Sequence, residues 1–100
     1  MDIVIRSKHI EDKLKVRNIG LEDIVQCFAN REGGFPEDNR PNHKTVPPTR
    51  WFIAEDDSGR LLKIVFMYLE GSKEIHVKSA FEPNSQQLLL YKKYLDTPRL

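Results

Sequence analysis

Residues 50–81 read RWFIAEDDSGRLLKIVFMYLEGSKEIHVKSAF, and this stretch decides the fold. It contains three runs rich in β-branched and aromatic residues, at 50–55, 60–69 and 74–81. Short segments of Asp, Ser, Gly and Glu separate the runs, and such segments are typical of tight turns. Two tight turns in succession force consecutive antiparallel pairing, so the sequence predicts a three-stranded antiparallel meander.

The segment before the meander predicts two helices. Ser7 is a suitable N-cap for a helix over about 8–18, and Gly20 is a suitable residue to end that helix. A second helix is predicted over 21–30, where apolar residues recur at helical spacing and two acidic residues lie in the first turn. The single cysteine, Cys27, falls within this apolar pattern and is expected in the core.

Each end of the chain adds one further element. Residues 3–5 are β-prone, which leaves open a fourth strand at the N-terminus. Pro83 and Asn84 open a last helix that runs to about Leu95. The expected fold class is α+β, with two N-terminal helices, the meander and a C-terminal helix in a single domain over residues 1–100.

A long segment without predicted helices or strands, residues 31–49, joins the helices to the meander. It contains four of the six prolines and two glycines, but few apolar residues. Loops of this length are uncommon in small domains, and those that occur are either functional or mobile.

Composition excludes several classes of protein. A single cysteine rules out a disulfide within the chain and a cysteine-based metal cluster, and His9, His43 and His76 lack zinc-ligand spacing. No metal or other cofactor is therefore expected. The chain has no apolar stretch long enough for a bilayer and no signal-peptide pattern, so we expect a cytoplasmic protein without a membrane partner. The net charge of +1 is low for a general nucleic-acid binder but leaves room for a local basic cleft.

The third strand of the meander predicts two faces of different character, because successive side chains of a strand point to opposite sides. Trp51, on the first strand, is expected in the core. One face of the third strand is predicted to point to the core and carries Ile75, Val77 and Ser79. The other face carries Glu74, His76, Lys78 and Ala80.

Lys63 lies in the middle of the predicted central strand, where a charged side chain is unusual. One interpretation is an ordinary solvated sheet face from which the lysine reaches water. The other is a wet cleft whose basic floor is formed by Lys63, His76 and Lys78. The sequence leaves both open, because a one-residue slip in hairpin register moves a side chain to the opposite face.

Metal-independent RNA cleavage is one chemistry that such a basic cleft could perform. It needs a base for the 2′-hydroxyl, cations for the transition-state charge and an acid for the leaving oxygen. Histidine suits proton transfer near neutral pH, and arginine and lysine suit the phosphate. The residues of suitable type are His9, Lys13, Arg17, Arg50, Lys63, His76 and Lys78.

Several short motifs resemble the small DUF4258 and BrnT-like proteins. They are SKH at 7–9, RNI at 17–19, LEDI at 21–24, GRLLKIVF at 59–66 and IHVKSA at 75–80. Together they cover most of the chain outside the 31–49 loop, which is long for that group. The resemblance implies a RelE-like fold and a metal-independent ribonuclease toxin that a cognate antitoxin protein neutralises.

The resemblance also assigns roles to residues of this chain. It favours His9, Arg17, Lys63 and Lys78 as catalytic residues, with Ser79 in support. Residue type adds Lys13, Arg50 and His76, so that the expected substrate-binding set is Lys13, Arg50, His76 and Ser79, with RNA as the substrate. The alternative hypothesis is a noncatalytic interaction module, such as an immunity or antitoxin-like protein.

Overall fold

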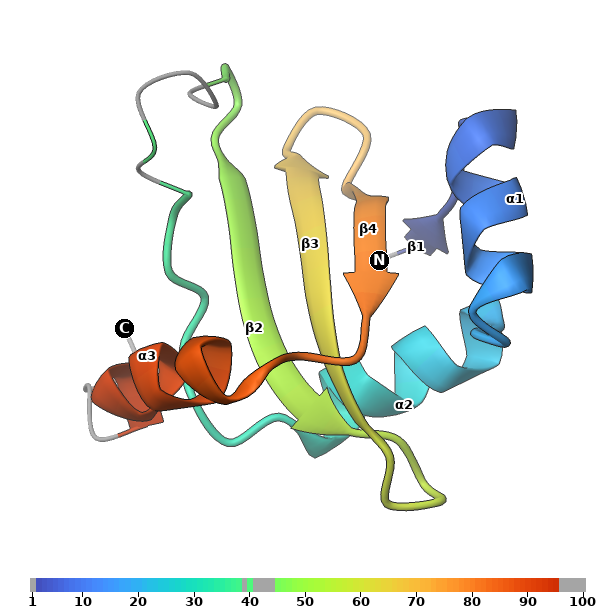
Figure 1. Cartoon of the computed structure of the whole chain (residues 1–100). Helices are drawn as coiled ribbons and strands as arrows, with labels where there is room; N and C mark the ends of the chain where they lie inside the picture. The colour runs from blue at the N-terminus through green and yellow to red at the C-terminus, as the bar shows by residue number, and fades with distance from the viewer. Residues whose placement is uncertain (1, 39, 41–44, 96–100) are drawn as a thin grey trace.

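The computed structural model describes residues 2–38, 40 and 45–95, and its centre is a four-stranded sheet (Figure 1). The predicted meander is present as β2 (Thr49–Glu55), β3 (Leu61–Leu69) and β4 (Glu74–Phe81), paired antiparallel. The segment left open at the N-terminus is a strand, β1 (Asp2–Val4), which pairs parallel to β4. The sheet is therefore mixed, in the order β1-β4-β3-β2, rather than a purely antiparallel meander.

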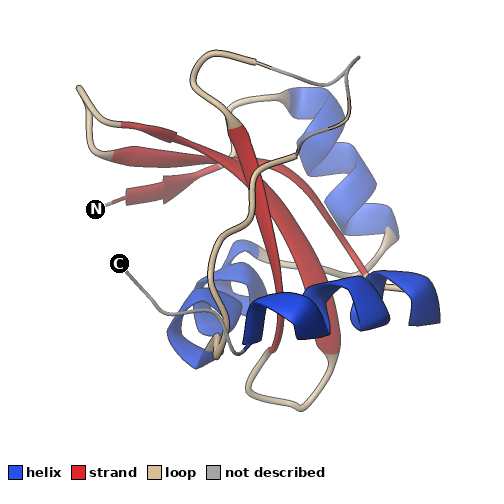
Figure 2. Ribbon diagram, turned by 90° about the vertical axis from the view of Figure 1, so that its left-hand side faces the viewer, coloured by secondary structure: helices blue, strands red, loops and turns tan. Residues whose placement is uncertain are grey.

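Three helices surround this sheet. They are α1 (Lys8–Val16), α2 (Leu21–Asn30) and α3 (Ser85–Leu95). Helix α1 lies beside the edge formed by β1 and β4 (Figure 1). Helices α2 and α3 lie on opposite sides of the sheet (Figure 2), so the two faces of the sheet have different coverings.

The turn between α1 and α2 differs from the predicted one. Ser7 caps α1 as expected, since its Oγ accepts a hydrogen bond from the Ile10 N–H at 3.3 Å. The helix ends at Val16, however, and the left-handed position after it is taken by Asn18 with φ of 56°. Asparagine tolerates this conformation well. Gly20 instead begins α2, where its N–H bonds to the Asp23 carboxylate at 2.9 Å.

The core between α2 and the sheet is fully buried. Phe52, Leu62 and Ile64 have no exposed surface, and Ile24 and Cys27 of α2 pack against them. The prediction that Cys27 is a core residue is confirmed. Burial raises the pKa of its thiol to about 12, which leaves it unreactive at neutral pH.

The opposite face of the sheet is covered by α3 only in part. Trp51 and Ile53 are buried under Tyr91, whose ring centre lies 5.4 Å from that of Trp51. The prediction that Trp51 packs in the core is therefore confirmed. The remainder of this face is not covered by α3.

Residues 36–38, within the predicted 31–49 loop, are more regular than the sequence suggests. They run along the outer edge of β2, where the Asp38 N–H bonds to the Thr49 carbonyl at 2.8 Å. The Trp51 N–H likewise bonds to the Pro36 carbonyl at 3.0 Å. An unpaired sheet edge is a template for aggregation, and these bonds protect it. Strand β2 starts at Thr49, the last residue of the predicted loop.

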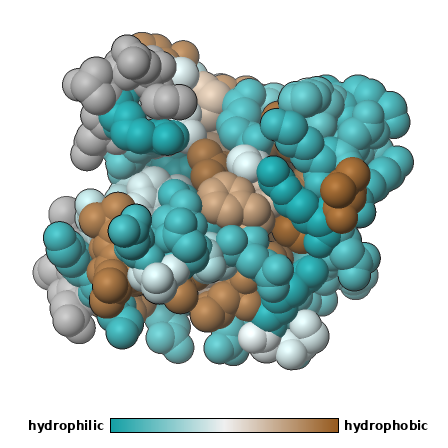
Figure 3. Space-filling view, viewed as in Figure 1, coloured by the Kyte–Doolittle hydropathy of each residue, from teal (hydrophilic) through white to brown (hydrophobic). Residues whose placement is uncertain are grey.

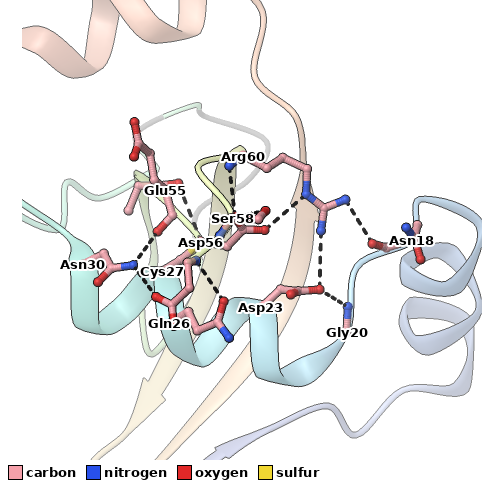
Figure 4. Close-up of polar contacts among 12 residues, drawn as sticks. Asn18, Gly20, Asp23, Gln26, Cys27, Asn30, Glu55, Asp56, Ser58 and Arg60 are labelled. Atoms are coloured by element: carbon pink, nitrogen blue, oxygen red, sulfur yellow. Dashed lines mark hydrogen bonds and ion pairs between the residues drawn. The ribbon is translucent and has the colours of Figure 1, made fainter.

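A polar network joins the β2–β3 turn to α2 and to the turn after α1 (Figure 4). The buried Asp56 carboxylate accepts bonds from the Ser58 hydroxyl and from the backbone N–H of Ser58 and Arg60. The Ser58 hydroxyl contributes most to the lowered pKa of Asp56. Arg60 also contacts Asp23 of α2 and the Asn18 carbonyl. Asp56 and Asp23 thus help to hold the turn and α2 together.

Removing the Phe52 side chain tests the α2 face of the core. We expect Phe52→Ala to lower the free energy of unfolding by about 3–5 kcal/mol, because the ring leaves a cavity in a fully buried site. This is a large share of the stability of a small domain, typically about 5–15 kcal/mol. Urea denaturation followed by circular dichroism measures the change.

The matched control is Val16→Ala, because Val16 is apolar but 88% exposed. That substitution should change the free energy of unfolding by less than about 0.5 kcal/mol. Equal effects of the two substitutions would contradict the described core.

Candidate functional site

A β-bulge in β4 determines which side chains reach the partly covered face. Val65 pairs with Ser79, whereas the next residue of β3, Phe66, pairs with Val77, so Lys78 is an extra residue in β4. Paired residues of an antiparallel sheet share a face, and the bulge therefore reverses the alternation after Val77.

The predicted faces of β4 are consequently wrong beyond the bulge. Ser79 was expected in the core with Ile75 and Val77, but it shares the face of Val65, opposite α2. Ala80 was expected on the outer face, but it pairs with Ile64 and is fully buried under α2. Simple alternation fails here because one inserted residue changes the side of every residue that follows.

The register of the sheet shows that Lys63 and His76 lie on the same face. Lys63 pairs with Phe81, and Met67 pairs with His76, on the face opposite α2. We call the half-buried part of this face the open face. Its side chains are Lys63, Val65, Met67, His76, Ser79 and Phe81. Figure 3 shows apolar atoms at the floor of a hollow on this side of the molecule, with polar atoms around it.

Lys63 lies in this face among aromatic rings. Its Nζ is 4.5 Å from the centre of the Trp51 ring and 5.8 Å from the centre of the Phe81 ring. Within the part of the chain that the structure describes, no carboxylate forms an ion pair with it. Burial lowers the pKa of Lys63 most, the charge of Arg40 lowers it further, and Asp38 opposes this effect.

Arg17, the C-cap residue of α1, reaches the same place. Its Nη1 donates to the Ala80 carbonyl at 3.0 Å, which fixes the side chain against the end of β4. Its guanidinium carbon lies 5.8 Å from the Phe81 ring centre, the same distance as Lys63 Nζ. The two cations are therefore no more than twice this distance apart. Of the four residues that the resemblance favours as catalytic, Arg17 and Lys63 lie near the same aromatic ring, that of Phe81.

A hollow of about 410 Å³ adjoins Lys63. Its walls include Glu37, Asp38 and Arg40 from the loop, Trp51 from β2 and residues of α3. Arg40 on this wall pairs with Asp38 at 2.6 Å. The lining residues are Glu37, Asp38, Arg40, Trp51, Lys63, Val65, Leu90 and Tyr94.

The remaining predicted residues of α1 lie along one stripe of the helix. His9, Lys13 and Arg17 are four residues apart and exposed, so they point the same way. The helical rise places His9 about 12 Å along the axis from Arg17. His9 and Lys13 extend the basic stripe away from Phe81 rather than joining it there.

Two predicted residues of β4, Lys78 and Ser79, lie at the bulge and just after it. Lys78 is exposed and Ser79 is half-buried beside Val65. His76 lies further back on the strand, about 16 Å from Phe81 at the usual strand rise.

His76 is held by an acidic neighbour. Its Nε2 lies 3.0 Å from Glu74 Oε1, and the other carboxylate oxygen of Glu74 accepts from Arg6 at 2.8 Å. The hydrogen bond to His76 is the main cause of the lowered pKa of Glu74, and Arg6 adds to it. The hydrogen bond to Glu74 therefore fixes the orientation of the His76 ring, which lies on the open face.

Arg50 does not join this group. It pairs with Phe66 in the sheet and so points to the α2 side, where its Nη1 donates to the Phe35 carbonyl at 3.0 Å. Its Nη2 pairs with Glu37 at 3.2 Å. The structure thus uses Arg50 to hold the long loop, on the face opposite Lys63.

Two residues of the site, Phe81 and Arg40, were not predicted from the sequence. Phe81 lies 5.8 Å from each of the two cations, but its position depends on the bulge, which leaves no mark in the residue pattern. Arg40 lies in the loop, and its approach to Lys63 depends on the pairing of the 36–38 segment with β2.

No metal site is found among the residues described, which contain no group of three potential ligands of the His, Cys, Asp or Glu type. His43 lies outside those residues. Within the same ranges, no helix combines the length and apolar character needed to cross a membrane.

Comparison with known proteins adds no family assignment. No protein-family model matches the chain, and no curated protein matches its sequence significantly. The likeness to DUF4258 and BrnT-like proteins therefore rests on the short motifs alone.

The lowered pKa of Lys63 can be measured directly. We expect Lys63 to titrate below the exposed lysines in an NMR titration of the ¹³C-dimethylated chain, because burial and Arg40 both disfavour its charge. Arg40→Gln should raise the pKa of Lys63, since it removes the repelling cation and leaves Asp38 nearby. Arg6→Gln, which changes a charge next to Glu74, is the control and should leave it unchanged. Titration of Lys63 together with the exposed lysines would contradict the described environment.

Proposed function

We propose that the chain is a metal-independent ribonuclease toxin that binds RNA along its open face. The observation that carries the proposal is the meeting of Arg17 and Lys63 at the Phe81 ring. Neither cation is paired with a carboxylate in the described ranges, so both are available to a phosphate. Phosphodiester recognition depends on such cations on a hollow surface.

The proposed reaction is a transesterification. The 2′-oxygen of RNA attacks the adjacent phosphorus, and the bond from phosphorus to the 5′-oxygen breaks. The products are a 2′,3′-cyclic phosphate and a 5′-hydroxyl. A base removes the 2′-hydroxyl proton, an acid protonates the leaving oxygen, and cations stabilise the added negative charge.

Arg17 and Lys63 fit two of these roles. Arg17 stays protonated and can donate parallel hydrogen bonds to a phosphate, which suits charge stabilisation. Lys63 has a lowered pKa, so its proton is released more readily, which suits the acid. Lys78, which is exposed at the bulge, is assigned to contact the phosphate that Arg17 and Lys63 bind.

The two imidazoles in the described ranges, His9 and His76, lie about 12 and 16 Å along their own elements from the Arg17–Phe81 contact, by the usual helical and strand rises. A general base must lie within hydrogen-bond reach of the proton that it removes, so neither imidazole is assigned as the base at the phosphate held by Arg17 and Lys63. The 2′-hydroxyl proton would pass to a solvent water. His9 and His76 would contact neighbouring nucleotides, together with Lys13 and Ser79, so His9→Ala and His76→Ala should weaken RNA binding more than they lower the rate of the bound RNA.

We further infer a RelE-like fold and a cytoplasmic protein with a cognate antitoxin partner. The support is the order of elements, in which two helices precede a meander and a helix follows it, together with the motifs described above. The alternative is a noncatalytic interaction module. It is favoured by the exposed leucines of α3, Leu89 and Leu90, which are 62% and 45% exposed.

RNA cleavage by the purified chain tests the proposal. We expect a labelled single-stranded RNA to be cut in the presence of EDTA, leaving a 2′,3′-cyclic phosphate. Arg17→Ala and Lys63→Ala should each reduce the rate about 100-fold or more, as expected for loss of transition-state charge stabilisation.

Lys15→Ala is the matched control. Lys15 is also a cation of α1, but it is exposed and pairs with Glu11. The variant should keep the wild-type rate. Absence of cleavage by the wild-type chain, together with harmless expression, would favour the interaction module; cleavage that survives both alanine substitutions would refute the assigned site.

A further inference from the structure

A second hollow lies on the other side of the sheet from Lys63. Its volume is about 400 Å³, and it is lined by Phe28, Arg31, Phe35, Arg50, Phe66, Tyr68 and Ile75. We call it the aromatic pocket. The proposed ribonuclease reaction uses none of its residues; Arg50, expected from the sequence to bind substrate, points to this side of the sheet.

The floor of the aromatic pocket is made of aromatic rings in contact. The ring centre of Phe66 lies 5.2 Å from that of Phe28 and 5.2 Å from that of Phe35. Phe28, Phe35 and Tyr68 are only half-buried. Such a surface gains free energy when another apolar group covers it.

The two arginines of the aromatic pocket differ. Arg50 is neutralised by Glu37 at 3.2 Å. Arg31 lies over the Phe35 ring, 4.0 Å from its centre, and donates one bond to the Gly33 carbonyl. No carboxylate of the described chain pairs with it. An unpaired guanidinium at the edge of an apolar hollow is suited to a carboxylate.

We propose that the aromatic pocket binds a segment of a partner protein that presents an aromatic or large aliphatic side chain next to a carboxylate. The apolar side chain covers the rings, and the carboxylate pairs with Arg31. Nucleic acid fits less well, because the pocket offers a single unpaired cation and has the Glu37 carboxylate beside it. Since this pocket and the open face lie on opposite sides of the sheet, both can be occupied at once.

A selection from a random peptide library displayed on phage tests this proposal with the full chain as target. We expect the enriched peptides to carry Trp, Phe, Tyr or Leu beside Asp or Glu. One enriched peptide should bind Arg31→Gln about tenfold or more weakly, as expected for a lost charge-assisted hydrogen bond. Tyr68→Ala should weaken it similarly through lost ring contact.

Arg17→Gln is the control for peptide binding, because it removes a cation from the open face, and it should leave the affinity unchanged. Amide shifts caused by the peptide should lie around Phe28, Arg31 and Tyr68. No enrichment, enrichment of basic peptides, unchanged affinity of Arg31→Gln or shifts around Lys63 would each overturn the proposal. RNA cleavage by Arg31→Gln should equal that of the wild type, so failure of this proposal is distinguishable from failure of the ribonuclease proposal.

Discussion

The arrangement of the candidate site depends on the bulge at Lys78. A strand alternates its side chains strictly, and one inserted residue exchanges the two faces for everything that follows. In β4 this exchange buries Ala80 under α2 and turns Phe81 to the open face, where it pairs with Lys63. Without the inserted residue, Phe81 would point toward α2. Arg17 and Lys63 would then have no common neighbour.

The two faces of the sheet have different environments, because α2 and α3 lie on opposite sides of it. On the α2 side, Phe52, Ile64 and Val77 build a dry core that supplies most of the apolar burial. On the other side, α3 covers only the end of β2, and the cation of Lys63 lies against the rings of Trp51 and Phe81. The half-buried position lowers the pKa of Lys63 without requiring an acidic partner. Stability and proposed chemistry are thus assigned to opposite faces of one sheet.

The sequence predicts the elements well and their mutual geometry less well. The meander, the Ser7 cap and the core positions of Cys27 and Trp51 follow from local patterns and are confirmed. The parallel pairing of β1 and the bulge at Lys78 depend on contacts between distant segments, which a residue pattern does not contain. For the same reason, residue type alone grouped Arg50 with Lys63, although the two lie on opposite faces.

The central claim is that Arg17 and Lys63 act on one phosphate. A double-mutant cycle measures this most directly, with the affinity for a noncleavable 2′-O-methyl RNA oligonucleotide as the readout for the wild type, Arg17→Ala, Lys63→Ala and the double variant. If both cations hold the same phosphate, the double variant should lose less affinity than the product of the two single losses, because residues that share a partner are not additive. Strictly multiplicative losses, or no loss at all, would contradict the account.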